Sequence, residues 1–187
     1  YQANNRLFYA GGVLTGPVRQ SQRYKDIFKL LDQTGYLDIY GAPDRWQHTP
    51  NSIRGFVPID GESLLKVNNQ CGVSLILHDH EHLHSGTPTG RIFESAASNT
   101  VIISDRNKFV IENFGDNVLY LDVDQDGHGI FKQIDQHMQW INEHPEQARQ
   151  MAERCHAIFL EKFTLEEQMQ KLIDLAASLP IQRNSHK

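Results

Sequence analysis

Residues 87–104 read TPTGRIFESAASNTVIIS, and this stretch predicts a loop, a short helix and a buried strand in succession. Pro88 and Gly90 end the preceding strand, so a helix that begins near Thr89 points its unpaired N–H groups and positive dipole end toward the loop. A diphosphate fits in front of such a helix end. Glu94 stands about one turn into the helix, where its carboxylate can accept hydrogen bonds from both hydroxyls of a ribose. The final VIIS is an apolar run short enough for a central parallel strand.

The rest of the chain alternates between short apolar runs and amphipathic segments. Strands are predicted at residues 7–10, 37–40, 53–57, 73–77, 100–104 and 118–121, helices at 21–33, 60–68 and 107–113, and a loop at 78–90. This is the pattern of a Rossmann-like α/β fold, an open parallel sheet with helices on both faces. From Gly129 onward no strand pattern recurs. Three helices are expected there, the last opening with the capping box of Thr164 and Glu167.

Length and composition restrict the classes of function. At 187 residues the chain is one domain, about 1–125 as β/α alternation and about 129–180 as helical tail, and it is too short for two Rossmann-like halves. A net charge of −5 without a basic run argues against a nucleic-acid partner. No apolar stretch approaches the roughly 20 residues of a membrane span, and the opening has no signal-peptide pattern. We therefore expect a cytoplasmic protein with at most peripheral membrane association, and Cys71 and Cys155 as buried thiols.

The block Gly90-Arg-Ile-Phe-Glu94, with the strand that follows it, resembles the nucleotide-sugar-binding half of GT-B glycosyltransferases, in particular CgeB-like and family 4 members. Segments in that family's order extend over nearly the whole chain, at residues 7–12, 37–41, 54–58, 73–77, 143–146 and 163–164. The resemblance implies the C-terminal half of a retaining, metal-independent hexosyltransferase in cell-surface glycan synthesis. Its donor is a nucleoside diphosphate sugar, its N-terminal acceptor-binding half lies outside this chain, and the isolated domain is expected to be inactive.

The donor-binding residues that we predict are Gly12, Arg19, Arg23, His78, Thr87, Thr89, Gly90, Arg91 and Glu94. Gly12 allows close backbone approach, and Arg23 stands where the family often has a lysine for the diphosphate. Arg91 follows the loop and reaches either a phosphate or one of the acidic residues Asp105 and Glu112. Family 4 enzymes often place a second glutamate eight residues before Glu94, and this chain has Gly86 there, which leaves its contacts to the sugar open.

Two residue groups allow other interpretations. The run HDHEHLH at residues 78–84 has the alternating imidazoles and carboxylates of a metal site, but a polar loop after a parallel strand contacts ligands without metal, and we predict none. The segment Asp105-Arg106-Asn107 either contacts the donor sugar, or Asp105 only caps the helix that follows it.

The alternatives for the whole protein are half of a nucleotide-sugar epimerase and a non-catalytic nucleotide-sugar module. A response-regulator-like or flavodoxin-like domain would need an acidic cluster at the end of the first strand, where this chain has Ala10 and two glycines.

Overall fold

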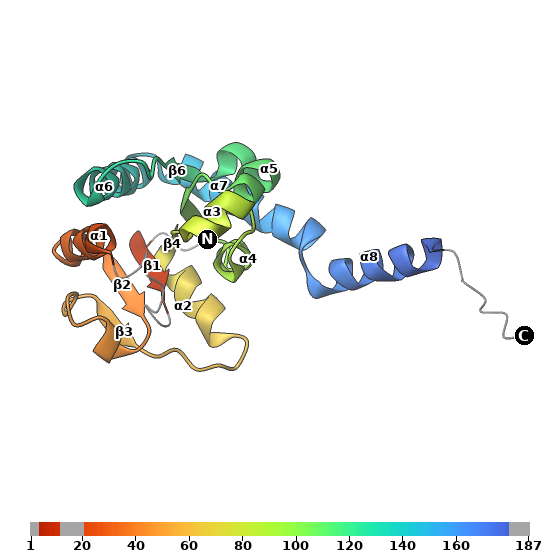
Figure 1. Cartoon of the computed structure of the whole chain (residues 1–187), viewed down its shortest axis with the longest axis horizontal. Helices are drawn as coiled ribbons and strands as arrows, with labels where there is room; N and C mark the ends of the chain where they lie inside the picture. The colour runs from red at the N-terminus through yellow and green to blue at the C-terminus, as the bar shows by residue number, and fades with distance from the viewer. Residues whose placement is uncertain (1–3, 12–20, 180–187) are drawn as a thin grey trace, which may run out of the picture.

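A six-stranded parallel sheet forms the centre of the protein, which is described here by a computed structural model of residues 4–11 and 21–179. The strands are β1 (Arg6–Ala10), β2 (Leu37–Tyr40), β3 (Ile53–Gly55), β4 (Gly72–Ile76), β5 (Val101–Asp105) and β6 (Leu119–Leu121). Their order is β3-β2-β1-β4-β5-β6 (Figure 1). The strand order reverses between β1 and β4. This reversal point leaves a crevice at the carboxyl edge, where open α/β sheets bind ligands.

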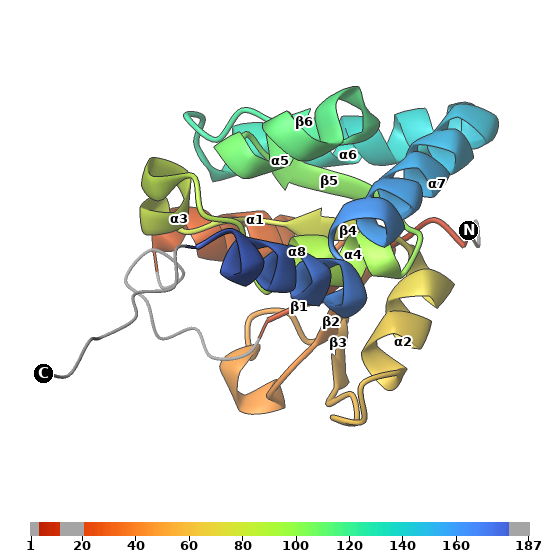
Figure 2. The same ribbon diagram turned by 90° about the vertical axis from the view of Figure 1, so that its right-hand side faces the viewer.

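Helices cover both faces of the sheet (Figures 1 and 2). They are α1 (Gln22–Asp32), α2 (Ser63–Cys71), α3 (His80–Ser85), α4 (Gly90–Ala97), α5 (Lys108–Phe114), α6 (Gly127–Glu143), α7 (Pro145–Lys162) and α8 (Leu165–Ser178), with 3₁₀ turns η1 (Pro43–Arg45) and η2 (Gly115–Asn117). Helices α1 and α6 bury apolar side chains against one face, and α4, α5 and α7 pack on the other. Every residue of β4 and β5 is buried, as expected for central strands covered on both sides.

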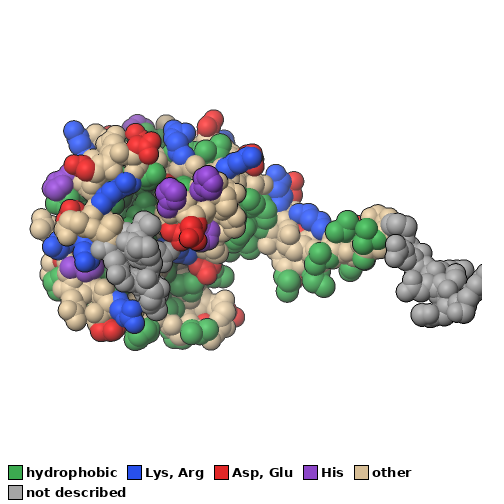
Figure 3. All heavy atoms as spheres, viewed as in Figure 1, with side chains coloured by type: hydrophobic (Ala, Val, Ile, Leu, Met, Phe, Trp, Pro, Cys, Tyr) green, Lys and Arg blue, Asp and Glu red, His purple; other side chains and the backbone are tan. Residues whose placement is uncertain are grey.

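Helix α8 lies apart from this two-sided core. It extends away from the body of the domain (Figure 1), and none of its described residues is buried. Its apolar side chains are exposed, with Leu165 at 73%, Leu172 at 59% and Ile173 at 56%. Figure 3 shows this apolar surface along the helix. The folded core is therefore complete without α8.

The predicted Rossmann-like fold is confirmed, with a parallel sheet and two buried cysteine thiols. The prediction of a loop at residues 78–90 is wrong, because this stretch contains α3. The carboxylate of Asp79 caps this helix by accepting a hydrogen bond from the N–H of His82 at 2.9 Å. The helix ends after six residues at Gly86, which has a left-handed φ of 71°.

The strand predicted at residues 53–57 ends early, at Gly55. Gly55 has a φ of 89°, and Pro58 has no N–H for a sheet hydrogen bond, so the chain leaves the sheet there. The helix predicted at residues 60–68 begins later, with Glu62 at the N-cap position, and Asp60 lies in the turn before it. The Asp60 side chain accepts hydrogen bonds from the N–H groups of Glu62 and Ser63, and the helix itself begins at Ser63.

Candidate functional site

Two cavities lie at the carboxyl edge of the sheet. The first, here called the switch-point cavity, has a volume of about 640 Å³ and is lined by Gly11, Gly41, Phe56, Thr89, Gly90, Arg91 and Glu94, among others. The second, here called the His78 cavity, has a volume of about 390 Å³ and is lined by residues that include Arg23, Leu77, His78, Asp105 and Asp124. Both volumes lie in the range of small-molecule sites, about 300–1,000 Å³.

The N-terminus of α4 opens into the switch-point cavity. Thr89 is the N-cap, but its side chain makes no capping hydrogen bond, and its buried hydroxyl has no partner among the described residues. A side chain at the next position, Gly90, would meet open space. The first N–H groups of a helix have no partner within it, so this end offers donors and a positive dipole to a ligand. An anion is the ligand that such a helix end favours.

Glu94 lines the same cavity, one turn further along α4. It also borders an apolar hollow beside α2 that contains Ile59 and Leu65. Burial raises the pKa of the Glu94 carboxyl, and the positive charge of Arg91 opposes the shift. The half-buried carboxylate is therefore an acceptor in a partly apolar environment, which strengthens hydrogen bonds from hydroxyl donors.

Arg91 lies between the ends of β1 and β4. Its guanidinium donates hydrogen bonds to the carbonyl oxygens of Ala10, at 3.5 Å, and Leu77, at 3.2 Å. It also lies 5.4 Å from the ring centroid of Tyr9, as a cation–π contact. The expected alternative partners, Asp105 and Glu112, are not the ones it contacts. The sheet thus fixes a positive charge at the reversal point of the strand order.

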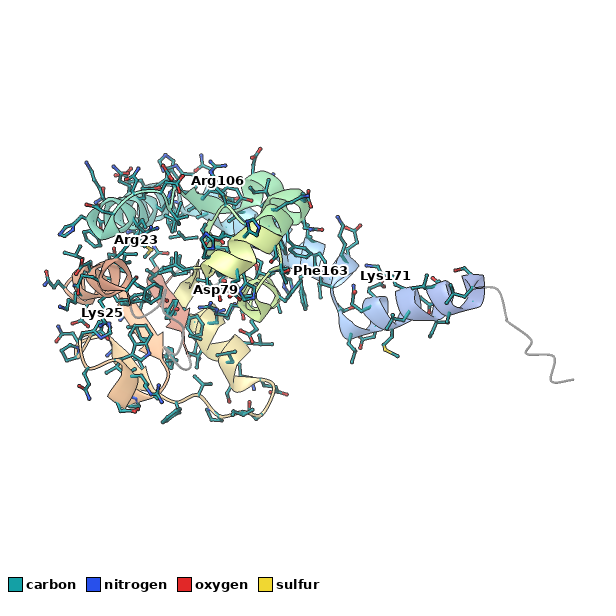
Figure 4. The ribbon with its side chains drawn as sticks, viewed as in Figure 1. Arg23, Lys25, Asp79, Arg106, Phe163 and Lys171 are labelled. Carbon is teal, nitrogen blue, oxygen red and sulfur yellow. The ribbon has the colours of Figure 1, made fainter. Side chains whose placement is uncertain are left out.

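His78 and Asp105 form a buried pair that lines the second cavity. The Nδ1 atom of His78 lies 2.6 Å from one carboxylate oxygen of Asp105, and the backbone N–H of His78 donates to the other at 2.6 Å. The expectation that Asp105 caps the following helix is wrong, because Asn107 holds that position. Arg23, at the start of α1 (Figure 4), lines this cavity and donates to the backbone oxygen of Val123.

Asn107 is a positioning residue, a role that the sequence analysis did not assign to it. Its side-chain amide donates to the carbonyl oxygens of His82 and Thr87, both at 3.0 Å, and its Oδ1 accepts from the N–H of Phe109 at 2.9 Å. The fully buried side chain therefore ties α3 and the loop before α4 to the start of α5. From the sequence, a polar residue directly before a helix indicates an N-cap. It does not indicate the hydrogen bonds to His82 and Thr87, because those residues are about 20 positions earlier in the chain.

The histidines of α3 make pairwise contacts. His80 and His84 lie on one side of the helix with ring centroids 6.4 Å apart, and His82 contacts Asp79 at 2.6 Å. Figure 3 shows histidine side chains at the surface near α3. In residues 4–11 and 21–179, no three His, Cys, Asp or Glu side chains are placed to hold a metal ion. The same part of the chain has no helix with the length and apolar character that a bilayer crossing requires.

The structure divides the predicted donor-binding residues. Thr89, Gly90, Arg91 and Glu94 line the switch-point cavity, whereas Arg23 and His78 line the His78 cavity. Glu94 therefore lines one cavity and His78 lines another, at the same edge of the sheet.

The other three predicted residues line neither cavity or are not described. Thr87 is exposed and is part of neither lining, although its carbonyl receives the hydrogen bond from Asn107. Gly12 and Arg19 lie outside the described residues.

The comparison with protein families gives a direct match. A family model described as glycosyl transferase-like matches residues 19–174. The chain belongs to this glycosyltransferase family. A search of curated proteins finds no match.

Solved structures of glycosyltransferases share the fold, and they identify it as one Rossmann-like half of the GT-B architecture. Anabaena HepE in complex with UDP-glucose has a TM-score of 0.64 at 13% identity, covering 95% of this chain and 50% of that one. T4 phage BGT with UDP-glucose has a TM-score of 0.62 at 17% identity, over 92% and 49%. Pneumococcal O-GlcNAc transferase GtfA with UDP and GlcNAc has a TM-score of 0.63 at 16% identity, over 95% and 37%. The glycosyltransferase chain described here thus spans half or less of these neighbours.

Proposed function

We propose that this glycosyltransferase chain is the donor-binding domain, and that it binds a nucleoside diphosphate sugar in the switch-point cavity. The observation that carries the proposal is the joint placement of Glu94 and the open N-terminus of α4 in one cavity at the reversal point of the strand order. An acceptor for ribose hydroxyls and a site for a diphosphate are one helical turn apart there. Neighbours of the same fold, HepE and BGT, bind UDP-glucose, which supports the proposal.

Each part of the donor has a matching feature in the cavity. The diphosphate lies before Thr89 and Gly90, where helix N–H groups and the unpaired Thr89 hydroxyl act as donors. The ribose lies beside Glu94. Phe56 lines the cavity with 75% of its surface exposed, and its ring is available to stack on the base. The carboxylate is kept away from the diphosphate by the turn of helix between Gly90 and Glu94, which limits the repulsion between their charges.

The chemistry that we propose is retaining transfer without a metal. Departure of the nucleoside diphosphate leaves positive character on the sugar and negative charge on the leaving group. Helix-end amides and the fixed guanidinium of Arg91 stabilise this negative charge as it develops, and so lower the barrier. No general base is assigned to this domain.

The acceptor, in this proposal, is bound by a second Rossmann-like half. The solved neighbours are at least about twice as long as this chain, and α8 presents an uncovered apolar face for such a half to contact. We therefore expect hexosyltransferase activity in cytoplasmic synthesis of cell-surface glycans only when both halves are present. The domain alone should show no turnover.

Calorimetric titration with nucleoside mono- and diphosphates tests the binding proposal. The diphosphate should bind more tightly than the monophosphate, and chelators should leave both affinities unchanged. Glu94→Gln replaces an acceptor oxygen by an amide donor, which should weaken ribonucleotide binding by roughly 1–3 kcal/mol. The matched control is Glu112→Gln on the exposed surface of α5, which should bind like the unchanged protein.

Two results would contradict the proposal. One is equal affinity for mono- and diphosphates. The other is a Glu94→Gln variant that binds the ribonucleotide normally. Deoxyribose analogues provide a further check, because their penalty should be much smaller in Glu94→Gln than in the unchanged protein.

A further inference from the structure

His82 and Asp79 form a histidine–aspartate pair at the edge of the switch-point cavity. His82 lines this cavity together with Thr89, Gly90 and Arg91. The Nδ1 atom of His82 lies 2.6 Å from Oδ1 of Asp79, which is the N-cap of α3 (Figure 4). The side chain of His82 is 37% exposed. This imidazole is therefore accessible to a ligand in the cavity.

Asn107 fixes the position of His82 relative to the helix end before which the diphosphate is proposed to lie. Its amide donates hydrogen bonds to the carbonyl oxygens of His82 and Thr87, both at 3.0 Å. Thr87 comes two residues before Thr89, the N-cap of α4. One buried side chain thus ties α3 to the start of α4, which limits movement of the imidazole relative to the cavity.

Asp79 determines which ring nitrogen of His82 carries the proton. A carboxylate only accepts hydrogen bonds, so the proton of the neutral ring lies on Nδ1, which donates to Asp79. Nε2 then has a lone pair and cannot donate. The oxygens of a diphosphate are acceptors as well. A hydrogen bond between Nε2 and a diphosphate oxygen therefore requires that the ring takes up a second proton.

The charges around His82 favour this protonation when an anion is bound. The Asp79 carboxylate attracts the positive charge of an imidazolium, whereas the guanidinium of Arg91, which lines the same cavity, repels it. A bound diphosphate changes this balance, because its negative charge lies near both cations. Binding of the diphosphate and protonation of His82 should therefore favour each other.

Other ionisable groups near the pair are His78, Glu94 and Lys108, with His80, Glu81 and His84 on α3 itself. The ring centroid of His78 is 6.3 Å from that of His82, but the His78 side chain is buried against Asp105. Glu94 lines the same cavity, and Lys108 contacts the end of α3. All of these groups are retained when His82 alone is substituted, so the comparison of the two proteins isolates its contribution.

We propose that His82 is a ligand of the donor diphosphate, and that it takes up a proton when the donor binds, with Asp79 holding the imidazolium in place. The inference rests on the proposed function, because it adds a residue to the same diphosphate site. When the bond between the sugar and the diphosphate breaks, its electron pair stays with the diphosphate oxygen. The imidazolium beside it stabilises this negative charge.

Calorimetric titration in buffers of different ionisation enthalpy measures the number of protons taken up on binding. The probes are UDP-glucose, UDP-N-acetylglucosamine and GDP-mannose. Both phosphates of a nucleotide sugar are diesters that stay ionised between about pH 6 and 8, so proton uptake in this range comes from the protein. At about pH 7.5 the unchanged chain should take up a proton fraction of at most about one per donor bound.

His82→Gln keeps a neutral donor near the position of Nε2 but cannot become a cation. It should abolish the proton uptake and weaken donor binding at about pH 6 by about three- to tenfold, the difference between a charged and a neutral hydrogen bond. The loss should be smaller at about pH 8, where fewer histidines are protonated.

Asp79→Asn provides a second test, because asparagine still caps α3 but lacks the charge that attracts the imidazolium. It should reduce the proton uptake as well. His84→Gln is the matched control, since His84 is exposed on the same helix and lines neither cavity. This control should bind and take up protons like the unchanged chain. Thermal unfolding shows which variants are folded, and one folded variant of the pair is sufficient.

Three results would overturn the inference while leaving the proposed function intact. The first is donor binding to the unchanged chain without proton uptake. The second is full uptake in His82→Gln, which would assign the proton to another group. The third is a loss of affinity in His82→Gln that is the same at both pH values, which would indicate a neutral contact or a role in folding. If no nucleotide sugar binds to the unchanged chain, the proposed function fails and the inference fails with it.

Discussion

Removing the side chain of Asn107 should both destabilise the domain and loosen the loop before α4. Asn107→Ala deletes the cap on α5 and both donors to the carbonyls of His82 and Thr87. Loss of the cap costs about 1 kcal/mol. Loss of the hydrogen bond to the carbonyl of the half-buried His82 costs about 1 kcal/mol of stability. Loss of the one to Thr87 costs about 0.5 kcal/mol, because Thr87 is exposed and water can replace the donor.

The sum predicts that Asn107→Ala loses about 2.5 kcal/mol of unfolding free energy, which lowers Tm by about 5–10 °C for a domain of this size. Asn107→Ser is the matched variant, because a serine hydroxyl still caps the helix but does not reach both carbonyls. It should lose about 1.5 kcal/mol. Nucleoside diphosphate binding should weaken in both variants, since the loop that contains Thr87 leads directly into the N-terminus of α4.

Differential scanning calorimetry of the three proteins, with titration of a nucleoside diphosphate, measures both effects. Equal Tm values for Asn107→Ala and Asn107→Ser would refute the role of the cap. A Tm in both variants equal to that of the unchanged protein would refute the whole network. Reduced stability with unchanged binding would show that other contacts hold the loop before α4 in place.

Three further predictions concern stability and reactivity. Deleting residues 165–187 should change Tm by less than about 2 °C in a thermal scan, because no described residue of α8 is buried; a large drop would show that α8 packs on the core. Cys71 and Cys155 should resist a thiol reagent in the native protein and react on unfolding, since burial raises the pKa of both thiols to about 12; rapid native labelling would contradict this. Burial raises the pKa of Glu94, so ionisation of this carboxyl destabilises the folded protein. Glu94→Gln should therefore raise Tm at pH 7. The gain should vanish as pH falls below about 4.3, where the carboxyl is protonated in both the folded and the unfolded protein. A Tm gain independent of pH would assign it to another cause.

Much of the fold follows from local sequence patterns. Valine and isoleucine recur in β4 and β5, which favours buried strands, and the alternation of strands with amphipathic segments is typical of a parallel sheet. Residues Pro88 to Glu94 predicted a helix N-terminus and a carboxylate one turn further on, and both line the switch-point cavity. Local signals failed at α3, where Asp79 caps a helix that was predicted to be a loop. The helix has six residues, most of them polar, so its sequence shows no apolar face.

The sequence by itself determined the fold class, the family and the identity of the residues at the helix end before the switch-point cavity, because these depend on neighbours within one turn or one strand. Only the tertiary structure decided that His78 pairs with Asp105 and that Arg91 binds the carbonyls of Ala10 and Leu77. It also decided that His78 and Glu94 line neighbouring cavities. These contacts join segments that lie far apart along the chain. Sequence spacing carries no information on their distances, which are determined by how parallel strands register and where helices pack between them.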